Sequence, residues 1–211
     1  MATKTGVKFL IQLTDEQKQA KAQILNHSFN FIMGEAGTGK SALAFQIALN
    51  AIFEKEVSKI IFIRSQIAVE EYGFLKGDLD EKVAPYFEYL TGLSKKIYAG
   101  TKDIEDMFKK GAIEFRPLGF VRGDTFDDCV VIVEEFQNLN EHQFQMLIER
   151  LGKRAKYIFT GSESQIDLKY KQDSCVHSLH KIVDDEAVFK CELTINHRNK
   201  DIQRLLCSLR G

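Results

Sequence analysis

The 211-residue chain is predicted to fold as an α/β domain of three layers with a mostly parallel sheet. Short apolar runs rich in branched and aromatic residues have the length of strands, and amphipathic segments of helix length separate most of them. Strands that alternate with helices favour a parallel sheet covered on both faces. A composition of 44% hydrophobic and 28% charged residues is typical of a chain that buries a core, and the length suits one domain over residues 1–211.

The expected elements follow from these patterns along the chain. The strands are residues 29–33, 59–63, 112–115, 130–133, 157–160 and 187–193, and the helices are residues 14–25, 41–53, 78–93, 140–151 and 199–209. The first helix begins with a capping pattern, because Gln17 stands at the third position after Thr14. Residues 72–101 are the most irregular stretch and are predicted to form an insertion or a mobile lid.

The charge balance and the cysteine content limit which partners and which cellular compartment we expect for this chain. The 29 basic and 30 acidic residues leave a net charge of -1, so a contact with nucleic acid is expected to be local. The four cysteines are too widely spaced for a metal or redox pair, which favours reduced thiols and a cytoplasmic protein. No window approaches the roughly 18 apolar residues of a membrane span, so no membrane contact is expected.

The strongest motif lies between the first strand and the second helix, and it matches G-x-x-x-x-G-K-[ST]. Its glycines allow a tight backbone turn whose N–H groups face an anion at a helix N-terminus. Lys40 is expected to reach the β and γ phosphates of ATP, and Ser41 to ligate Mg²⁺. The alternative is a glycine turn that only precedes a buried helix, and such a turn would require neither Lys40 nor Ser41. The predicted nucleotide-binding residues are Gly34, Glu35, Ala36, Gly37, Thr38, Gly39, Lys40 and Ser41.

Two carboxylates follow the buried apolar run 129–133. The carboxyl ends of parallel strands are where α/β sheets bind ligands. We expect Glu134 to hold Mg²⁺ and Glu135 to act as the base that polarises the attacking water. The alternative is that both are merely the solvated first turn after the strand, and the phosphate loop in the same chain makes that alternative weaker.

An ordered series of further segments resembles the PhoH-like P-loop ATPases, which are relatives of the helicase ATPase cores and imply a RecA-like fold. Residues 134–138, Glu-Glu-Phe-Gln-Asn, are similar to the family's Asp-Glu-Ala-Gln-Asn. Residues 160–168 resemble its Gly-Asp-x-x-Gln-x-Asp-Leu stretch, and residues 73–86, 113–123 and 149–152 resemble three others. The resemblance runs from about residue 12 to 206.

The chain also departs from the family pattern. Glu134 and Ser162 each replace an Asp, Asp124 stands where the family has an Arg, and Ser65 stands where Pro follows Arg64. The longer side chain of Glu134 and the charge lost at Ser162 imply slow or altered catalysis.

Carried over by position, the resemblance implies roles for several more residues. Gln165 would sense the γ-phosphate or water, and Gln17, in a helicase-like opening, would read adenine, because an amide both donates and accepts. Arg198 lies in Asn-His-Arg-Asn and is the candidate for a charge-stabilising arginine finger. The candidates for nucleic-acid or interface contacts are Arg64, Arg122 and Arg150. A solvated or ion-paired structural role remains the alternative for each arginine.

The expected function is Mg²⁺-dependent ATP binding and hydrolysis, coupled to RNA or single-stranded DNA, with duplex unwinding as a compatible activity. The alternative is a nucleotide-gated module that binds a protein partner and turns ATP over incidentally. Helicase cores complete each ATP site with an arginine from a second domain, and this chain is too short to hold both. A homo-oligomer, such as a head-to-tail hexameric ring, would supply the missing residue.

Overall fold

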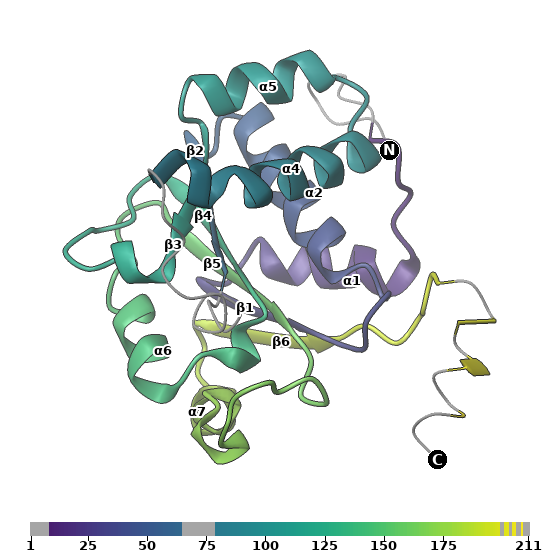
Figure 1. The fold of residues 1–211 in the computed structure, drawn as a ribbon, viewed down its shortest axis with the longest axis vertical. Helices are drawn as coiled ribbons and strands as arrows, with labels where there is room; N and C mark the ends of the chain where they lie inside the picture. The colour runs from purple at the N-terminus through teal and green to yellow at the C-terminus, as the bar shows by residue number, and fades with distance from the viewer. Residues whose placement is uncertain (1–8, 65–78, 199–200, 203, 206–207, 209–211) are drawn as a thin grey trace.

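The computed structural model describes residues 9–64, 79–198, 201–202, 204–205 and 208, and its centre is a six-stranded sheet (Figure 1). The strand order is β3-β2-β4-β5-β1-β6, and every neighbouring pair is parallel. The strands are β1 Phe29–Met33, β2 Lys59–Arg64, β3 Ile113–Pro117, β4 Cys129–Glu134, β5 Lys156–Gly161 and β6 Val188–Glu192. The predicted RecA-like α/β architecture is therefore confirmed, with a wholly parallel sheet.

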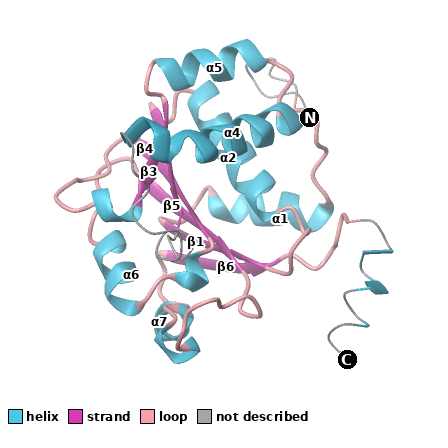
Figure 2. Ribbon diagram, in the orientation of Figure 1, coloured by secondary structure: helices cyan, strands magenta, loops and turns pink. Residues whose placement is uncertain are grey.

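Helices cover both faces of this sheet, as Figure 2 shows. They are α1 Asp15–Ile24, α2 Lys40–Phe53, α4 Leu79–Ile97, α5 Thr101–Lys109, α6 Glu141–Ile148 and α7 Val176–Ile182. The first four pack on one face through a core that includes Ile24, Leu43 and Ile104, while α6 and α7 pack on the other through Phe144 and Leu179. These are the three layers that the alternating pattern predicted.

Strand β4 shows why the apolar runs of the sequence are continuous. All six of its residues are buried, and neighbouring side chains point into different cores. Val130 and Ile132 belong to the core beneath α2, whereas Val131 and Val133 belong to the core beneath α6. A strand buried on both faces has no position for a polar side chain until it ends, at Glu134.

The predicted strands all form, but the segment between β2 and β3 differs from the expectation. Its described part, from Leu79, is mostly helical: α4 confirms the helix expected over residues 78–93 and continues to Ile97, whereas α5 was not expected. Gly92 and Gly100 favoured a loop, yet Ile104, Met107 and Phe108 recur at helical spacing and pack on the core. Residues 72–78, the rest of the expected lid, lie outside the described residues.

Two further expectations concern the ends and the thiols. The helix expected over 199–209 falls largely outside the described residues, as does Cys207. The other three cysteines are free; Cys129 and Cys175 are buried, and burial raises the pKa of each to about 12. Among the helices that the structure describes, none is both long and apolar enough to cross a bilayer.

Candidate nucleotide-binding site

The phosphate loop connects the end of β1 to the start of α2, as its motif predicted. Three of its glycines, Gly34, Gly37 and Gly39, have positive φ angles of 141°, 95° and 85°, which L side chains rarely adopt. A Cβ on Gly34 would lie 2.4 Å from the carbonyl oxygen of Leu193, so the loop also needs glycine where the chain leaves β6. No side chain caps α2, which leaves the N–H groups of its first turn for an anion.

Lys40 lies inside the curve of this loop. Its Nζ donates hydrogen bonds of 2.6 Å and 2.9 Å to the carbonyl oxygens of Gly34 and Glu35. Burial lowers the pKa of Lys40, and the negative charge of Glu135 opposes that shift most strongly among its neighbours. The cation therefore lies beside both the loop and the predicted base.

Ser41 and Glu134 meet at the point where Mg²⁺ was expected. Glu134 is buried, with 5% of its surface exposed; its carboxylate accepts a hydrogen bond of 2.9 Å from the phenol of Tyr89, and the Ser41 hydroxyl lies beside it. Burial raises the pKa of Glu134 in spite of these contacts. A hydroxyl and a carboxylate beside a phosphate loop are hard oxygen donors, so the residues present fit a magnesium ion.

Glu135 follows in an unusual backbone conformation. Its φ and ψ angles are 53° and 41°, in the left-handed region, which costs a non-glycine residue about 1–3 kcal/mol. This turn makes the main chain leave β4 sharply. Such strain is concentrated at functional sites, where the surrounding contacts maintain it.

Gln137 is a central residue of the site that the sequence analysis did not single out. It is fully buried, and its Nε2 donates to Glu135 Oε2 at 2.6 Å and to the Gln165 carbonyl at 2.9 Å. Its Oε1 accepts from the main-chain N–H of Ser162 at 3.2 Å. One amide therefore joins the ends of β4 and β5. The sequence signal that could have identified Gln137 is its position in the segment 134–138, which resembles a family motif.

The loop after β5 also contacts the phosphate loop. Ser164 donates to Glu35 Oε1 at 2.6 Å and lies 3.0 Å from the Ser162 hydroxyl. The main chain of Gln165 is held by Ser162 and Gln137, which places this predicted sensor beside the base. Ser162, which replaces a family aspartate, thus takes part in a hydroxyl-mediated connection that ends on the Glu35 carboxylate of the phosphate loop.

The segment after β6 lies on the phosphate loop of its own chain. The N–H of His197 donates to Gly37 O at 2.9 Å, and Asn196 Nδ2 donates to Ala36 O at 3.0 Å. A Cβ on Gly37 would lie 2.6 Å from Cγ of Arg198. The structure therefore brings Arg198 directly onto the loop.

Gln17 reaches the loop from the other side. Its side chain is buried, with Oε1 accepting from the N–H of Thr14 at 3.1 Å and Nε2 donating to Thr38 O at 3.2 Å. The predicted capping box of α1 is formed by the same amide. Gln17 thus connects the start of α1 to the phosphate loop, and reading of adenine stays a prediction.

The three remaining arginines are separated in the structure. Arg64 pairs with Glu134 in the register of β2 and β4, and its guanidinium lies 5.5 Å from the centre of the Tyr89 ring. Arg122 is exposed on the loop after β3, which is the edge strand. Arg150 lies between α6 and β5, at the amino ends of the strands, whereas the phosphate loop lies at their carboxyl ends. Only Arg64 of these three joins the site.

A phosphate loop between β1 and α2, together with paired carboxylates at the end of β4, defines a nucleotide-binding domain of the P-loop class. Residues 10–205 match the family model described as "PhoH: PhoH-like protein". The chain belongs to this PhoH-like family, as the series of segments indicated.

Curated relatives share substantial identity with this chain. The PhoH-like protein of Synechocystis sp. is 37% identical over 182 residues, which cover 85% of this chain and 55% of the relative. The PhoH-like protein of Bacillus subtilis is 40% identical over 153 residues, covering 72% and 48%. Protein PhoH of Escherichia coli K12 is 37% identical over 140 residues, covering 65% and 40%. The chain spans about half the length of these relatives.

Solved structures resemble the chain in fold. The SWI2/SNF2 ATPase core of Sulfolobus solfataricus, solved in complex with dsDNA, has a TM-score of 0.51 at 11% identity and covers 88% of this chain and 46% of that one. The Pif1 helicase of Candida albicans has a TM-score of 0.49 at 19% identity, covering 95% and 44%. Identities this low concern the fold alone, and the likeness in fold rests on the first of these two structures.

Proposed function

We propose that this chain binds ATP with Mg²⁺ and hydrolyses its β-γ phosphoanhydride. The observation that carries the proposal is the convergence of Lys40, Glu135 and Arg198 on one phosphate loop. The first and last are cations beside the phosphate position, and the second is a carboxylate that can accept a proton from water. A small-molecule kinase would instead need a site for a substrate hydroxyl.

Each residue then has a defined task. Lys40 exchanges the carbonyls of Gly34 and Glu35 for phosphate oxygens, at little cost in desolvation because it is already half-buried. Ser41 and Glu134 would hold Mg²⁺, which supplies neutralising charge to the phosphate oxygens. Glu135, held by Gln137, accepts a proton from the attacking water, and Gln165 orients that water.

Arg198 stabilises the negative charge that develops on the transferred phosphoryl group. Because its side chain lies on Gly37 of the same chain, we propose that it acts in cis. A residue shared between subunits would then be another arginine. Arg122 is exposed and available to a neighbouring subunit.

The proposed client is RNA or single-stranded DNA. The carboxyl edge of the sheet carries Arg64 and, beyond β3, exposed Arg122 beside Phe120, whose side chain is 63% exposed. Cations and an exposed aromatic ring are the groups that bind a phosphate backbone and stack on bases. We further propose a cytoplasmic homo-oligomer, with a hexameric ring as the arrangement in which each chain contacts the next head to tail.

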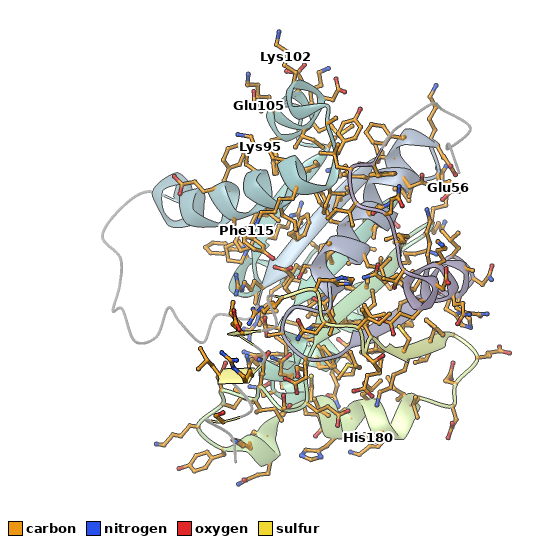
Figure 3. The ribbon with its side chains drawn as sticks, turned by 90° about the vertical axis from the view of Figure 1, so that its right-hand side faces the viewer. Glu56, Lys95, Lys102, Glu105, Phe115 and His180 are labelled. Carbon is orange, nitrogen blue, oxygen red and sulfur yellow. The ribbon has the colours of Figure 1, made fainter. Side chains whose placement is uncertain are left out.

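The second candidate function is a nucleotide-gated protein-binding module. An open groove of about 510 Å³ lies between α4, α5 and β3, lined mainly by Phe87, Phe108, Ile113 and Phe115. Figure 3 labels Phe115 below α4. Helix α4 also contains Tyr89, whose hydroxyl donates to Glu134 in the nucleotide site. One helix therefore lines this groove and contacts the nucleotide site. That shared helix is the observation that favours the module.

Phosphate release with and without single-stranded RNA or DNA separates the two functions. Wild type is expected to hydrolyse ATP and to be stimulated by a polymer, whereas Lys40→Ala and Glu135→Gln lose turnover. Glu135→Gln should still bind ATP, because it keeps the phosphate loop. A wild type no faster than Lys40→Ala with any polymer contradicts the hydrolase and favours the module. If ATP turnover is the same with and without RNA or DNA, the nucleic-acid client is contradicted and the proposed ATP hydrolysis stands.

A further inference from the structure

Tyr89 approaches the magnesium side of the site from α4, at a position outside the segments that resemble the family. Its hydroxyl donates to Glu134 Oε1 at 2.9 Å and lies beside the Ser41 side chain. Its ring lies under the guanidinium of Arg64, 5.5 Å from the ring centre to Cζ. The ring keeps some exposure while the phenol oxygen points inward to the carboxylate. Tyr89 therefore contacts one of the expected metal-binding residues, Glu134, and lies beside the other, Ser41.

Glu134 needs such a contact for a physical reason. A glutamate side chain has three rotatable bonds, and an unrestrained carboxylate would spread over several rotamers. Ser41 and Tyr89 approach this carboxylate from different elements, α2 and α4, and Arg64 places a positive charge nearby. A hydrogen bond to a charged acceptor is among the stronger ones in proteins.

We propose that Tyr89 is a positioning residue for the magnesium site. Its hydroxyl holds the Glu134 carboxylate facing Ser41, and this arrangement raises the affinity for Mg²⁺ in the nucleotide complex. The proposal rests on the proposed function, because it assumes that nucleotide binds with magnesium. The role assigned to Tyr89 is exerted through the Glu134 carboxylate, to which its hydroxyl donates.

The test is equilibrium binding of fluorescent N-methylanthraniloyl ADP, titrated with Mg²⁺ and repeated in EDTA. For Tyr89→Phe we expect the half-saturating Mg²⁺ concentration to rise about tenfold, as the loss of one hydrogen bond to a charged group implies. Affinity in EDTA should stay within about twofold of wild type, because the phosphate loop is unchanged. The ring under Arg64 is retained, and thermal unfolding checks that the variant is folded.

The matched control is Tyr98→Phe. Tyr98 also donates to a carboxylate at 2.9 Å, that of Asp103, but at the far end of α4 from Glu134. This variant removes a phenol-to-carboxylate hydrogen bond of the same length, exposed to solvent and away from the phosphate loop, and should leave both constants unchanged. An equal Mg²⁺ shift in both variants would mean that the effect arises from the general stability of α4, and would overturn the proposal.

A double-mutant cycle adds a readout that a structural role would not move. In Glu134→Asp the carboxylate retreats by one methylene from Tyr89, so the added Tyr89→Phe change should shift the Mg²⁺ constant much less than in wild type. An equal shift in both backgrounds overturns the proposal, as does a Tyr89→Phe protein that binds Mg²⁺ as tightly as wild type or more tightly. If wild type binds no nucleotide, or binds it independently of Mg²⁺, the proposed function fails too.

Discussion

The amide of Gln137 donates a hydrogen bond of 2.6 Å to the carboxylate of Glu135 and thereby fixes the predicted base against the end of β5. Its second N–H donates to the Gln165 carbonyl, and its oxygen accepts a hydrogen bond from the N–H of Ser162. A flip of the amide would therefore break all three contacts. The left-handed backbone of Glu135 is held by this buried residue two positions later.

Gln137→Leu should therefore impair catalysis more than nucleotide binding. Without the amide the Glu135 carboxylate can turn away from water, and because a general base contributes roughly 10²–10⁴-fold, we expect kcat to fall about tenfold or more. Two main-chain groups lose their partner, which should lower the free energy of unfolding by about 1–3 kcal/mol. Steady-state kinetics and urea unfolding measure these effects.

The control is Asn30→Leu. The Asn30 amide is equally buried and donates to the carbonyls of His27 and Tyr157, near the start of β1 and away from the phosphate loop. Asn30→Leu should lower the free energy of unfolding by an amount similar to Gln137→Leu and leave kcat unchanged. An unaltered kcat in Gln137→Leu would contradict a role in holding the base.

Two glycine substitutions should change stability in opposite directions. A Cβ on Gly161 would lie 2.3 Å from Gln137 Oε1 and 2.7 Å from Cδ1 of Phe136, so Gly161→Ala should destabilise by about 1–3 kcal/mol through overpacking. A Cβ on Gly92, within α4, meets nothing within 4 Å, so Gly92→Ala should stabilise by about 0.5–1 kcal/mol. Urea unfolding of both variants measures the signs, and stabilisation by Gly161→Ala would refute the close approach of Gln137.

Arg198→Ala should lower kcat by about 10³-fold or more if it is the charge-stabilising residue. Because its side chain lies on Gly37 of the same chain, mixing Arg198→Ala with Lys40→Ala subunits should recover no activity. Each mixed site would lack either its own lysine or its own arginine. Phosphate release across mixing ratios is the measurement, and recovery above the sum of the separate proteins would show action in trans.

Glu16 should make stability depend on pH in the acid range. Burial would raise the pKa of Glu16, but hydrogen bonds from Thr194 and Ile195 outweigh it and leave the pKa below the usual 4.5. The folded state then binds this proton less readily than the unfolded state, so the contribution is complete above pH 4.5 and is lost as pH falls through the folded pKa.

The comparison is unfolding of wild type and Glu16→Gln between pH 3 and 7. The difference in free energy of unfolding should be present at pH 7 and shrink toward pH 3, and a constant difference would contradict this account. Hydrogen exchange should also show faster opening of residues 194–198 in Glu16→Gln, because this carboxylate anchors the segment that carries Arg198.

The strands and the phosphate loop could be predicted because their signals are local. An uninterrupted apolar run predicts a strand such as β4, and glycines at fixed spacing before Lys40 predict the phosphate loop. Helix α5 was missed because the glycines on either side of it, Gly100 and Gly111, favour loops, while the packing of Ile104 that stabilises it depends on contacts distant in sequence.

By itself the sequence determined the parallel α/β fold, the phosphate loop and the two carboxylates after β4, since each depends on residues adjacent in the chain. Only the tertiary structure decided that Tyr89 reaches Glu134 across 45 positions and that Arg198 lies on Gly37 of its own chain. It also placed Arg150 at the amino ends of the strands, away from the phosphate loop at their carboxyl ends. The physical reason is that these contacts arise from strand order and helix packing, which bring together residues whose spacing in sequence carries no signal.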